Sequence, residues 1–429
     1  MPQLAAQDEF FQSYDDENGH YMAAKGEVIY EERGGYMIDS LIATGTFGTV
    51  YRGHSLKGSE AYKKDVNSVA IKFIRSIQKY ANAAEVEIEI LSRLNNYDLP
   101  KRRRVTHLVD HFEFKKHIVM VFPCYGNSLL DFIKLNEHRG YNQEWTLEFT
   151  RSISHCMSYI HSQKIIHTDL KPENIVATSK THRSNLRGKI FCYPVTAEVI
   201  TIDLGSAIHA ASDPDRRPPL VCTRQYRPPE VITGLAYDSS VDVWSLGCIV
   251  YELATGIPLF NTHRNTQHLA MVEKLLGPAP PLFMQRLQDR VRLTKLPAAE
   301  CGIKYFNEAG VIAWHDRLTE AERVGLERAP SLAKLEETLP SAVVGVIRCC
   351  LTWLPENRVT MQDVAAILSA SPPDPRMLAM ASLVAETEGA YRTGQRAVAG
   401  AGTLMRHAAA IADLDPKLRR SKSRGSISR

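Results

Sequence analysis

The 429-residue sequence lacks a long uninterrupted apolar run and a strong excess of charge of either sign. Its most apolar stretch, residues 243–260, contains Glu252 and two glycines and falls short of the roughly 20 apolar residues that a membrane-spanning helix needs. We therefore expect a buried helix there and no membrane partner. The formal net charge is only +4, so we expect no direct nucleic-acid partner.

The sequence also lacks a zinc-binding cysteine pattern and an export signal. None of the eight cysteines forms a Cys-x-x-Cys pair with a matching His or Cys pair, which excludes a zinc site of that kind. The first residues contain no basic stretch followed by an apolar run, so we expect a chain that is not exported. A reducing nucleus or cytoplasm fits such a chain best.

What is present indicates a globular protein with a β-rich part first. The hydrophobic content of 44% is enough for two lobes or two small domains. Residues 1–34 are acidic and predict an extension, either a tether or an arm packed on a domain. Residues 35–125 contain short β-branched and aromatic segments, which predict a small sheet with strands at residues 37–42, 49–52, 69–74 and 118–122. One helix interrupts this sheet at about residues 80–94, where Ala84, Ile88, Leu91 and Leu94 share a face.

The rest of the chain is predicted to be mainly helical. In residues 126–370, apolar stripes at helical spacing replace the strand pattern. An insertion is predicted near residues 263–340, and residues 278–340 are expected to be irregular. Residues 371–429 contain an alanine-rich stretch and a basic end, so we predict a helical tail with a disordered terminus.

Two features of the β-rich part are typical of nucleotide-binding sites. Gly45 and Gly48 lie where one predicted strand turns into the next, and glycines there let backbone N–H groups approach phosphates, although an ordinary hairpin fits equally well. Lys72 lies mid-strand among buried neighbours and needs an anion, because an unpaired buried ammonium costs several kcal/mol. Glu87 shares the helical face of Ala84 and is the predicted partner; a surface lysine and an unrelated glutamate are the alternative. Such a pair positions the α- and β-phosphates of ATP in kinases.

Residues 165–174, Ile-Ile-His-Thr-Asp-Leu-Lys-Pro-Glu-Asn, resemble the catalytic loop of protein kinases. The resemblance implies that Asp169 accepts or orients the substrate hydroxyl proton and that Lys171 neutralises the transferring phosphoryl group. It also implies that Asn174 and Asp203 hold Mg²⁺. Asp203 begins an Asp-Leu-Gly sequence, in which Leu204 replaces the phenylalanine of the family.

The order of these motifs implies the α+β, bilobal eukaryotic protein kinase fold, with a small β-rich N-lobe and a larger helical C-lobe. In this fold Glu230 is expected to form an ion pair with Arg358, and Asp242 to hold the catalytic-loop backbone.

The resemblance further implies ATP contacts at Ile42, Ala43, Gly45, Gly48, Val50, Ala70, Lys72, Phe122, Pro123, Tyr125 and Asn174. Ala43 stands where the family has its first glycine. Cys124, between Pro123 and Tyr125, is interpreted as a small apolar filler.

Within the kinases, the chain resembles a divergent member of the LAMMER (CDC-like) family of the CMGC group. Thr168 before Asp169, residues 203–207 and 222–227, and residues 268–277 carry this resemblance, which covers about residues 15–370. It implies a serine/threonine kinase with dual specificity, protein substrates rich in Arg–Ser, a nuclear and partly cytoplasmic location and a monomer. Kinetochore substrates are a second option. The tail at residues 417–424 is interpreted as a nuclear signal, as a substrate or as a solvated segment.

Two rival interpretations differ in specific residues. A DYRK-type kinase would have Tyr-x-Tyr in the segment where this chain has residues 222–226, Cys-Thr-Arg-Gln-Tyr. A pseudokinase scaffold would lack catalytic groups, whereas the chain departs from the family pattern only mildly, at Ala43, Leu204 and Pro228. Thr168 cannot supply the bidentate, charged contact with which an arginine orders a phosphorylated loop. We therefore expect activity without an upstream kinase.

Overall fold

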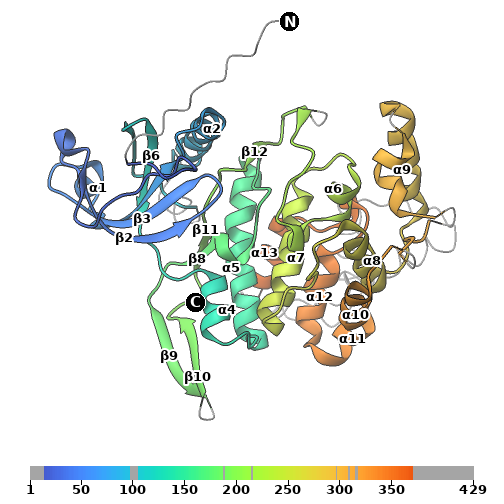
Figure 1. The fold of residues 1–429 in the computed structure, drawn as a ribbon. Helices are drawn as coiled ribbons and strands as arrows, with labels where there is room; N and C mark the ends of the chain where they lie inside the picture. Colours follow the sequence, from blue (N-terminus) through green and yellow to red (C-terminus); the bar gives the residue numbers. More distant parts are fainter. Residues whose placement is uncertain are drawn as a thin grey trace, which may run out of the picture. The chain divides into compact units, whose positions relative to one another are not determined.

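The computed structural model describes residues 14–96, 105–186, 189–213, 216–295, 297–307, 310–314 and 317–370. They fall into two compact units. The first contains the described residues up to Gly126 together with Ile200–Ala207, and the second contains Asn127–Val199 and the residues from Ile208 onward. The first unit is built around a sheet and the second is mainly helical (Figure 1). Among the described residues, no helix has both the length and the apolar character of a membrane span.

Six antiparallel strands form the sheet of the first unit, in the order β1-β2-β3-β4-β6-β5. Their bounds are Val28–Ile29 (β1), Tyr36–Thr44 (β2), Gly48–Ser55 (β3), Ser68–Ile74 (β4), Asp110–Phe114 (β5) and His117–Pro123 (β6). The four predicted strands are present. The sequence did not predict β1, which has two residues, or β5, in which only Phe112 is buried among polar neighbours.

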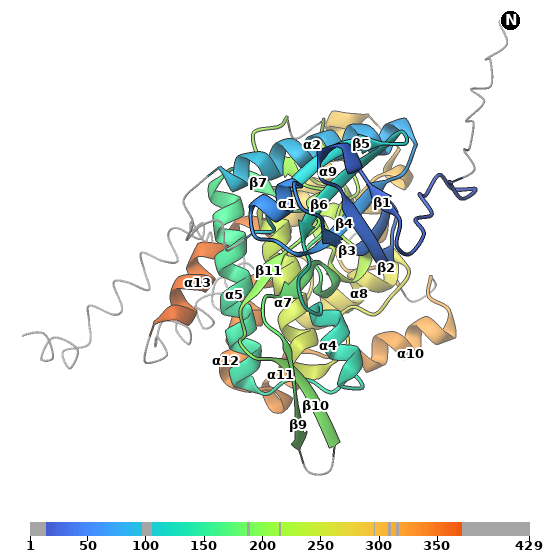
Figure 2. The same ribbon diagram turned by 90° about the vertical axis from the view of Figure 1, so that its left-hand side faces the viewer.

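One long helix, α2 (Gln78–Asn95), contacts β4 and β6 of this sheet, and Figure 2 shows it beside the strands. A single turn, α1 (Glu60–Lys63), precedes β4. The buried face of α2 includes Glu87 and Leu91, as predicted. The prediction was wrong for Ile88, which is only half-buried. Ile90 takes the core position instead, because it follows Glu87 by three residues and shares its face.

The acidic N-terminal arm packs on the first unit. Tyr21 is 1% exposed and stacks on Phe73 of β4, with ring centroids 4.5 Å apart. Asp15 Oδ1 lies 2.8 Å from Nε2 of His117, whose Nδ1 lies 2.7 Å from the carbonyl oxygen of Ile74. The interpretation as a packed arm therefore holds for residues 14–34, while residues 1–13 lie outside the described residues.

The helices of the second unit pack around α7, which is buried from Val241 to Leu253 and confirms the predicted buried helix. Helix α7 contacts α5 and α12, and α5 also contacts α13. The bounds are Leu129–Leu135 (α4), Gln143–Ser162 (α5), Pro229–Thr233 (α6), Ser240–Thr255 (α7), Asn265–Leu276 (α8), Pro281–Thr294 (α9), Glu320–Arg328 (α10), Leu332–Thr338 (α11), Ser341–Cys350 (α12) and Met361–Ser369 (α13).

The prediction of irregular structure over residues 278–340 was wrong for α9, α10 and α11. Their charged residues cover the exposed faces of amphipathic helices. In α9 the buried residues Phe283 and Leu287 lie one turn apart. A capping box starts α10, because the Thr319 side chain accepts from the Glu322 N–H and the Glu322 carboxylate accepts from the Thr319 N–H.

Short strands connect these helices. They are β7 (Ile165–Ile166), β8 (Ile175–Ala177), β9 (Thr181–Leu186), β10 (Lys189–Pro194), β11 (Val199–Thr201) and β12 (Ile208–His209). Strand β7 pairs with β12 and leads into the catalytic loop. Strands β9 and β10 form a hairpin (Figure 1). The domain boundaries proposed from the sequence stay predictions, and the tail from residue 371 lies outside the described residues.

Candidate active site

The strand β4 and the helix α2 bring Lys72 and Glu87 together. Lys72 Nζ donates to both carboxylate oxygens of Glu87, at 3.0 and 2.9 Å. The two residues are 9% and 3% exposed, so the pair is shielded from water. The pair that the sequence predicted is therefore formed, and it ties the middle of a strand to the middle of a helix.

Asp203 joins this pair within the first unit. Lys72 Nζ also donates to Asp203 Oδ1, at 2.9 Å. Burial by itself would lower the pKa of the Lys72 ammonium, but the carboxylates of Asp203 and Glu87 outweigh burial and raise that pKa. Lys72 is therefore a fixed positive charge, as a phosphate-binding lysine must be.

The residues after Asp203 fit closely against Glu87. A Cβ atom at Gly205 would lie 3.1 Å from Glu87 Oε2 and 3.2 Å from Asp203 Oδ1, so a side chain there would crowd both carboxylates. Leu204 is 1% exposed and occupies a buried apolar position, as expected for the residue that replaces phenylalanine.

The glycine-containing turn between β2 and β3 has one glycine that packing explains and one that it does not. A Cβ at Gly48 would lie 1.9 Å from the carbonyl oxygen of Phe73, so the neighbouring strand requires glycine. At Gly45 the nearest atom to such a Cβ is Gly48 O, at 4.0 Å. The chain itself therefore does not require a glycine at position 45.

The sheet register places most of the predicted nucleotide contacts on one face. Directly opposed pairs across antiparallel strands share a face, as do alternate residues along a strand. Ala43 pairs with Val50, Val50 with Lys72, and Ala70 with Phe122. Of the other predicted contacts of the first unit, Ile42 is exposed on β2, Pro123 ends β6, and half-buried Tyr125 lies just after it.

Arg75 connects three parts of the first unit and was not predicted from the sequence. Its Nε donates to the carbonyl of Asn18 in the arm, at 2.7 Å, and its backbone N–H donates to the carbonyl of Phe47 in the glycine turn, at 3.0 Å. Its guanidinium donates to the hydroxyl of Tyr80 at the start of α2, at 3.2 Å. Arg75 therefore links the arm to the turn and to the helix that carries Glu87.

The catalytic loop of the second unit holds Asp169 in a fixed set of donors. Its Oδ1 accepts from the backbone N–H of Thr223 at 3.0 Å and from the Thr223 hydroxyl at 2.7 Å. Its Oδ2 accepts from Lys171 Nζ at 2.7 Å, and Lys171 also donates to the Thr223 hydroxyl at 3.0 Å. Asn174 Nδ2 donates to the backbone oxygen of Asp169 at 3.0 Å. The three residues that the sequence singled out in this loop therefore form one network.

Thr223 is a member of this network that the sequence analysis missed. The sequence analysis gave it no role of its own, and it lies 54 positions after Asp169. No local spacing connects residues so far apart. The signal that was available is its place between Cys222 and Arg224, in the segment that resembles LAMMER kinases.

Asp242 holds the backbone of the catalytic loop, as expected. Its carboxylate accepts from the backbone N–H groups of His167 and Thr168, both at 2.9 Å. His161 Nε2, which sequence reasoning missed, lies 2.8 Å from the same carboxylate. Burial alone would raise the pKa of the Asp242 carboxyl, but the contact with His161 and the N–H of His167 hold it below its usual value.

Glu230 and Arg358 form the predicted ion pair, with N–O distances of 2.6 and 2.7 Å and side chains that are at most 1% exposed. Removing one member of a buried pair leaves an uncompensated charge or an unsatisfied donor. We expect Glu230→Gln to lower the free energy of unfolding by about 3–5 kcal/mol. Denaturant unfolding measures this change.

The control for this prediction is Glu337→Gln, because Glu337 pairs with Lys334 on the surface, with side chains 67% and 59% exposed. Its effect is expected to stay within about 0.5 kcal/mol. Equal effects of the two variants would contradict the assigned role of the buried pair.

Arginine side chains order the activation segment. The buried Arg227 donates from Nε and Nη2 to the carbonyl of Cys222, at 3.1 and 2.8 Å. Arg217, which was not predicted, donates to the carbonyls of Ala210 and Tyr237. Cys222 N–H donates to Thr168 O at 2.8 Å, so the segment is tied to the loop at the position where Thr168 replaces arginine.

The residues expected to hold a divalent ion supply oxygen atoms. Asp203 offers a carboxylate, and Asn174 uses its Nδ2 for Asp169, which leaves its amide oxygen for another partner. Each residue therefore offers an oxygen atom of the kind that Mg²⁺ binds together with phosphate and water. No group of three or more His, Cys, Asp or Glu side chains arranged for a metal occurs within the described ranges.

Comparisons with known proteins agree with this geometry. Residues 36–367 match the protein kinase domain family. The chain is similar to serine/threonine-protein kinase AFC3 of Arabidopsis thaliana, with 34% identity over 363 residues, 81% of this chain and 84% of that one. It is similar to the dual specificity protein kinase CLK1 of Homo sapiens, with 31% identity over 360 residues, 81% and 68% of the two chains. The crystal structure of the PF14_0431 kinase domain gives a TM-score of 0.70 at 27% identity, covering 81% and 98% of the two chains.

Other relatives match over a smaller share of their length. The chain spans 66% of serine/threonine-protein kinase AFC1 of Arabidopsis thaliana, at 35% identity, and 30% of the probable dual specificity protein kinase madd-3 of Caenorhabditis elegans, at 36% identity. The expected α+β kinase fold is confirmed. The protein kinase domain family in general implies the use of ATP and a divalent ion. The chain belongs to the protein kinase family, in its LAMMER (CDC-like) branch of serine/threonine and dual-specificity kinases.

Proposed function

We propose that this chain transfers the γ-phosphate of ATP, bound with Mg²⁺, to serine and threonine hydroxyls of proteins, and to its own tyrosine. The observation that carries the proposal is the Asp169 carboxylate, held by the Thr223 hydroxyl and by Lys171 in a partly exposed loop. A carboxylate fixed in this way is suited to accept a hydroxyl proton. The pair of Lys72 and Glu87 supports it, because a shielded, permanently charged lysine suits phosphate binding.

Each of the site residues has a separate role in this reaction. Lys72 binds the α- and β-phosphates and is kept in place by Glu87, while Asp203 and Asn174 would hold Mg²⁺, which offsets phosphate charge when bound. Asp169 orients the acceptor hydroxyl and takes its proton. Lys171 is a positive charge next to that carboxylate and stabilises the transferring phosphoryl group.

The glycine at position 45 is evidence that the first unit binds a nucleotide. Packing within the chain explains the absence of a side chain at Gly48 but not at Gly45, where a Cβ would find open space. A phosphate that approaches the backbone closely would explain it. The apolar residue Ile42, 47% exposed, lies on β2 just before this turn and would be covered by the nucleotide.

For substrates, we propose proteins with Arg–Ser dipeptides, a nuclear and partly cytoplasmic location and a monomeric enzyme; kinetochore proteins are the second substrate option. The resemblance to LAMMER kinases supports this choice. A peptide containing Arg–Ser should be phosphorylated with a higher kcat/KM than the same peptide with Lys–Ser or Ala–Ser. Equal values for the three peptides would contradict the substrate assignment.

The arginine contacts in the activation segment support a further expectation about activation. Arg217 and Arg227 already satisfy carbonyls along the segment, and Thr168 cannot pair with a phosphate as an arginine would. Protein stripped by a phosphatase, and shown to be unmodified by mass spectrometry, should phosphorylate an Arg–Ser peptide without a lag. A long lag that ends when the loop becomes phosphorylated would overturn this prediction.

A pseudokinase scaffold is the alternative function, and Leu204 together with Ala43 is the observation that favours it. These residues depart from the family pattern in the metal-binding and glycine elements. A scaffold would bind nucleotide or a partner and transfer no phosphate. Phosphate transfer to a peptide by the wild-type chain decides against this alternative.

A further inference from the structure

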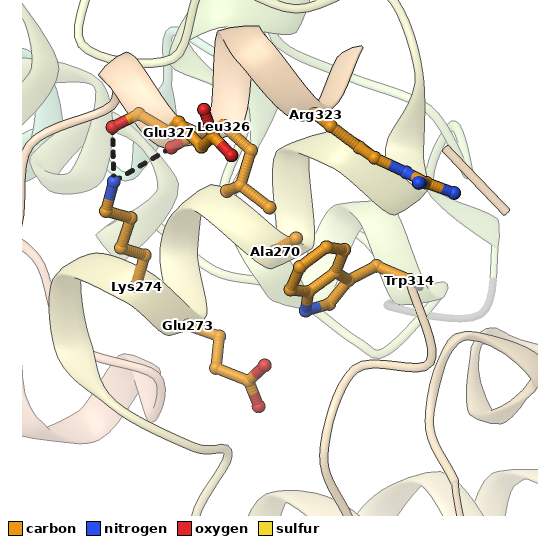
Figure 3. Close-up of a pocket in the computed structure, with 7 residues that line it drawn as sticks. All are labelled: Ala270, Glu273, Lys274, Trp314, Arg323, Leu326 and Glu327. Atoms are coloured by element: carbon orange, nitrogen blue, oxygen red, sulfur yellow. Dashed lines mark hydrogen bonds between the residues drawn. The ribbon is translucent and has the colours of Figure 1, made fainter. Parts of the chain in front are cut away.

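Two regions of the chain have no role in the reaction proposed above. One is a pocket of about 530 Å³ in the second unit, between α8, α10 and the loop that carries Trp314 (Figure 3). Its charged lining consists of two acidic and two basic side chains, Glu273, Glu327, Lys274 and Arg323. These charges balance and select no class of ligand. The other region is the contact between the N-terminal arm and β6, which has a more specific chemistry.

Both ring nitrogens of His117 on β6 face oxygen atoms that can only accept a hydrogen bond. Nδ1 lies 2.7 Å from the carbonyl oxygen of Ile74, and Nε2 lies 2.8 Å from Asp15 Oδ1. A neutral imidazole carries one ring hydrogen, whereas an imidazolium carries two. Both contacts are therefore hydrogen bonds only when His117 is charged.

Asp15 is the anion that matches this charge. Its Oδ2 accepts from the Ser76 hydroxyl at 2.9 Å, and a donated hydrogen bond favours the ionised carboxylate. The side chains of Asp15 and His117 are 3% and 0% exposed, so solvent and salt screen their attraction little. Either neutral tautomer of His117 would lose this ion pair and one of the two hydrogen bonds.

Other titratable groups around this ring keep their protonation state near neutral pH. They come from the arm, from the end of β4 and from the turn before β6, and are Tyr14, His20, Tyr21, Arg75 and Lys115. Burial raises the pKa of Tyr14 and of Tyr21. Burial also lowers the pKa of His20, which is therefore neutral at a pH where an ordinary histidine still titrates. Lys115 forms an ion pair with Glu27, at 3.2 Å.

The arm also contacts the segment that follows β4. The N–H of Ser76 donates to the carbonyl of Gly19 at 3.0 Å, and Arg75 Nε donates to the carbonyl of Asn18 at 2.7 Å. The backbone N–H of Arg75 donates to the carbonyl of Phe47 in the glycine turn, at 3.0 Å. The arm and the glycine turn are therefore attached to the same short segment, and release of the arm would free it.

We propose that Asp15 and His117 are positioning residues for the nucleotide site: charged His117 holds the arm on the sheet, and the held arm keeps the glycine turn in position for ATP. The inference rests on the proposed function, because it assigns the turn to ATP. The arm is held while His117 keeps both ring hydrogens, so it is held at low pH and released as the pH rises. The apparent affinity for ATP falls with the fraction of molecules that hold the arm.

The test compares the KM for ATP of the full chain at about pH 6 and about pH 8.5, which bracket histidine titration in proteins, with an Arg–Ser peptide as acceptor. His117→Gln can neither titrate nor donate to both acceptors. Its KM should be about fivefold above wild type at the lower pH and equal to wild type at the higher pH, with kcat changed much less. Titration of ATP itself cancels in this ratio. The matched control is His111→Gln, an exposed histidine on the edge strand β5, with an expected ratio of about one at both pH values.

Asp15→Asn tests the same contact from the arm and leaves the sheet unchanged, so it carries the test if thermal unfolding shows that His117→Gln is not folded. It should raise the KM for ATP about fivefold at the lower pH. Hydrogen exchange at that pH needs no catalysis. The Ser76 amide, which donates to Gly19, should exchange about fivefold faster in Asp15→Asn than in wild type. The control on the arm is Glu17→Gln, because Glu17 is exposed, and it should change neither quantity.

The outcomes separate the positioning role from the proposed function. KM ratios for His117→Gln that are equal at the two pH values would overturn the role of the charge. Faster exchange of the Ser76 amide in Asp15→Asn with an unchanged KM would overturn the role of the arm. Absence of phosphate transfer by wild type would overturn the proposed function instead. Titration with ATP would then replace KM: weaker binding by Asp15→Asn than by wild type at the lower pH would support the positioning role, and equal binding would overturn it.

Discussion

Replacing Asp169 with asparagine is expected to lower kcat about 10²- to 10⁴-fold while folding and ATP binding stay close to wild type. In the wild-type chain the Thr223 hydroxyl donates to Asp169 Oδ1 at 2.7 Å. The oxygen of an asparagine amide can still accept this hydrogen bond, so the loop keeps one of its contacts. The amide can no longer take a proton from the acceptor hydroxyl. Steady-state kinetics with an Arg–Ser peptide, together with nucleotide titration and thermal unfolding, measures the three quantities.

The matched control is Asp65→Asn. Asp65 is exposed and has a φ of 60°, a conformation that asparagine adopts as readily as aspartate. This variant should have wild-type kcat. If Asp169→Asn transferred phosphate as fast as Asp65→Asn, the role assigned to Asp169 would be wrong.

The second large effect concerns Lys72 and Glu87. Lys72→Met should remove most of the activity, because it deletes the ammonium that pairs with Glu87 and Asp203. Glu87→Ala should also lower kcat/KM strongly, because it releases that ammonium from α2. The double variant should lose less than the product of the two single losses, since the residues act as one unit.

The control for this comparison of single and double variants is a glutamate on the same helix. Glu85 is exposed on α2, so Glu85→Ala combined with Lys72→Met should give losses that multiply. Multiplicative losses for Glu87 as well would show that its contact with Lys72 does not matter for the reaction.

The sequence was most informative where a charge had to be buried. The prediction of the Lys72–Glu87 pair followed from helical periodicity and from the cost of an unpaired ammonium, and both are local properties. The ion pair of Glu230 with Arg358 connects residues 128 positions apart, and only the family resemblance indicated it. Secondary structure was likewise predicted where the local pattern was strong. Strands with apolar, β-branched residues were predicted, while β5, with one buried side chain, was missed.

The missed site residues have contacts that depend on tertiary structure. Thr223, Arg217 and Arg75 act through hydrogen bonds to backbone carbonyls or to distant side chains. A hydroxyl or a guanidinium can make such bonds from many positions, so residue type alone does not identify the partner. His161 is an end-of-helix histidine whose contact with Asp242 forms only when α5 packs on α7.

The most direct test of the account is transfer of labelled γ-phosphate from ATP to an Arg–Ser peptide by the full chain, with and without Mg²⁺, in wild type and Asp169→Asn. The account predicts labelled phosphoserine with wild type and Mg²⁺, almost none without a divalent ion, and a loss of at least about 10²-fold with Asp169→Asn. Nucleotide binding by the wild-type chain without transfer to any hydroxyl, or equal labelling by the two proteins, would contradict it.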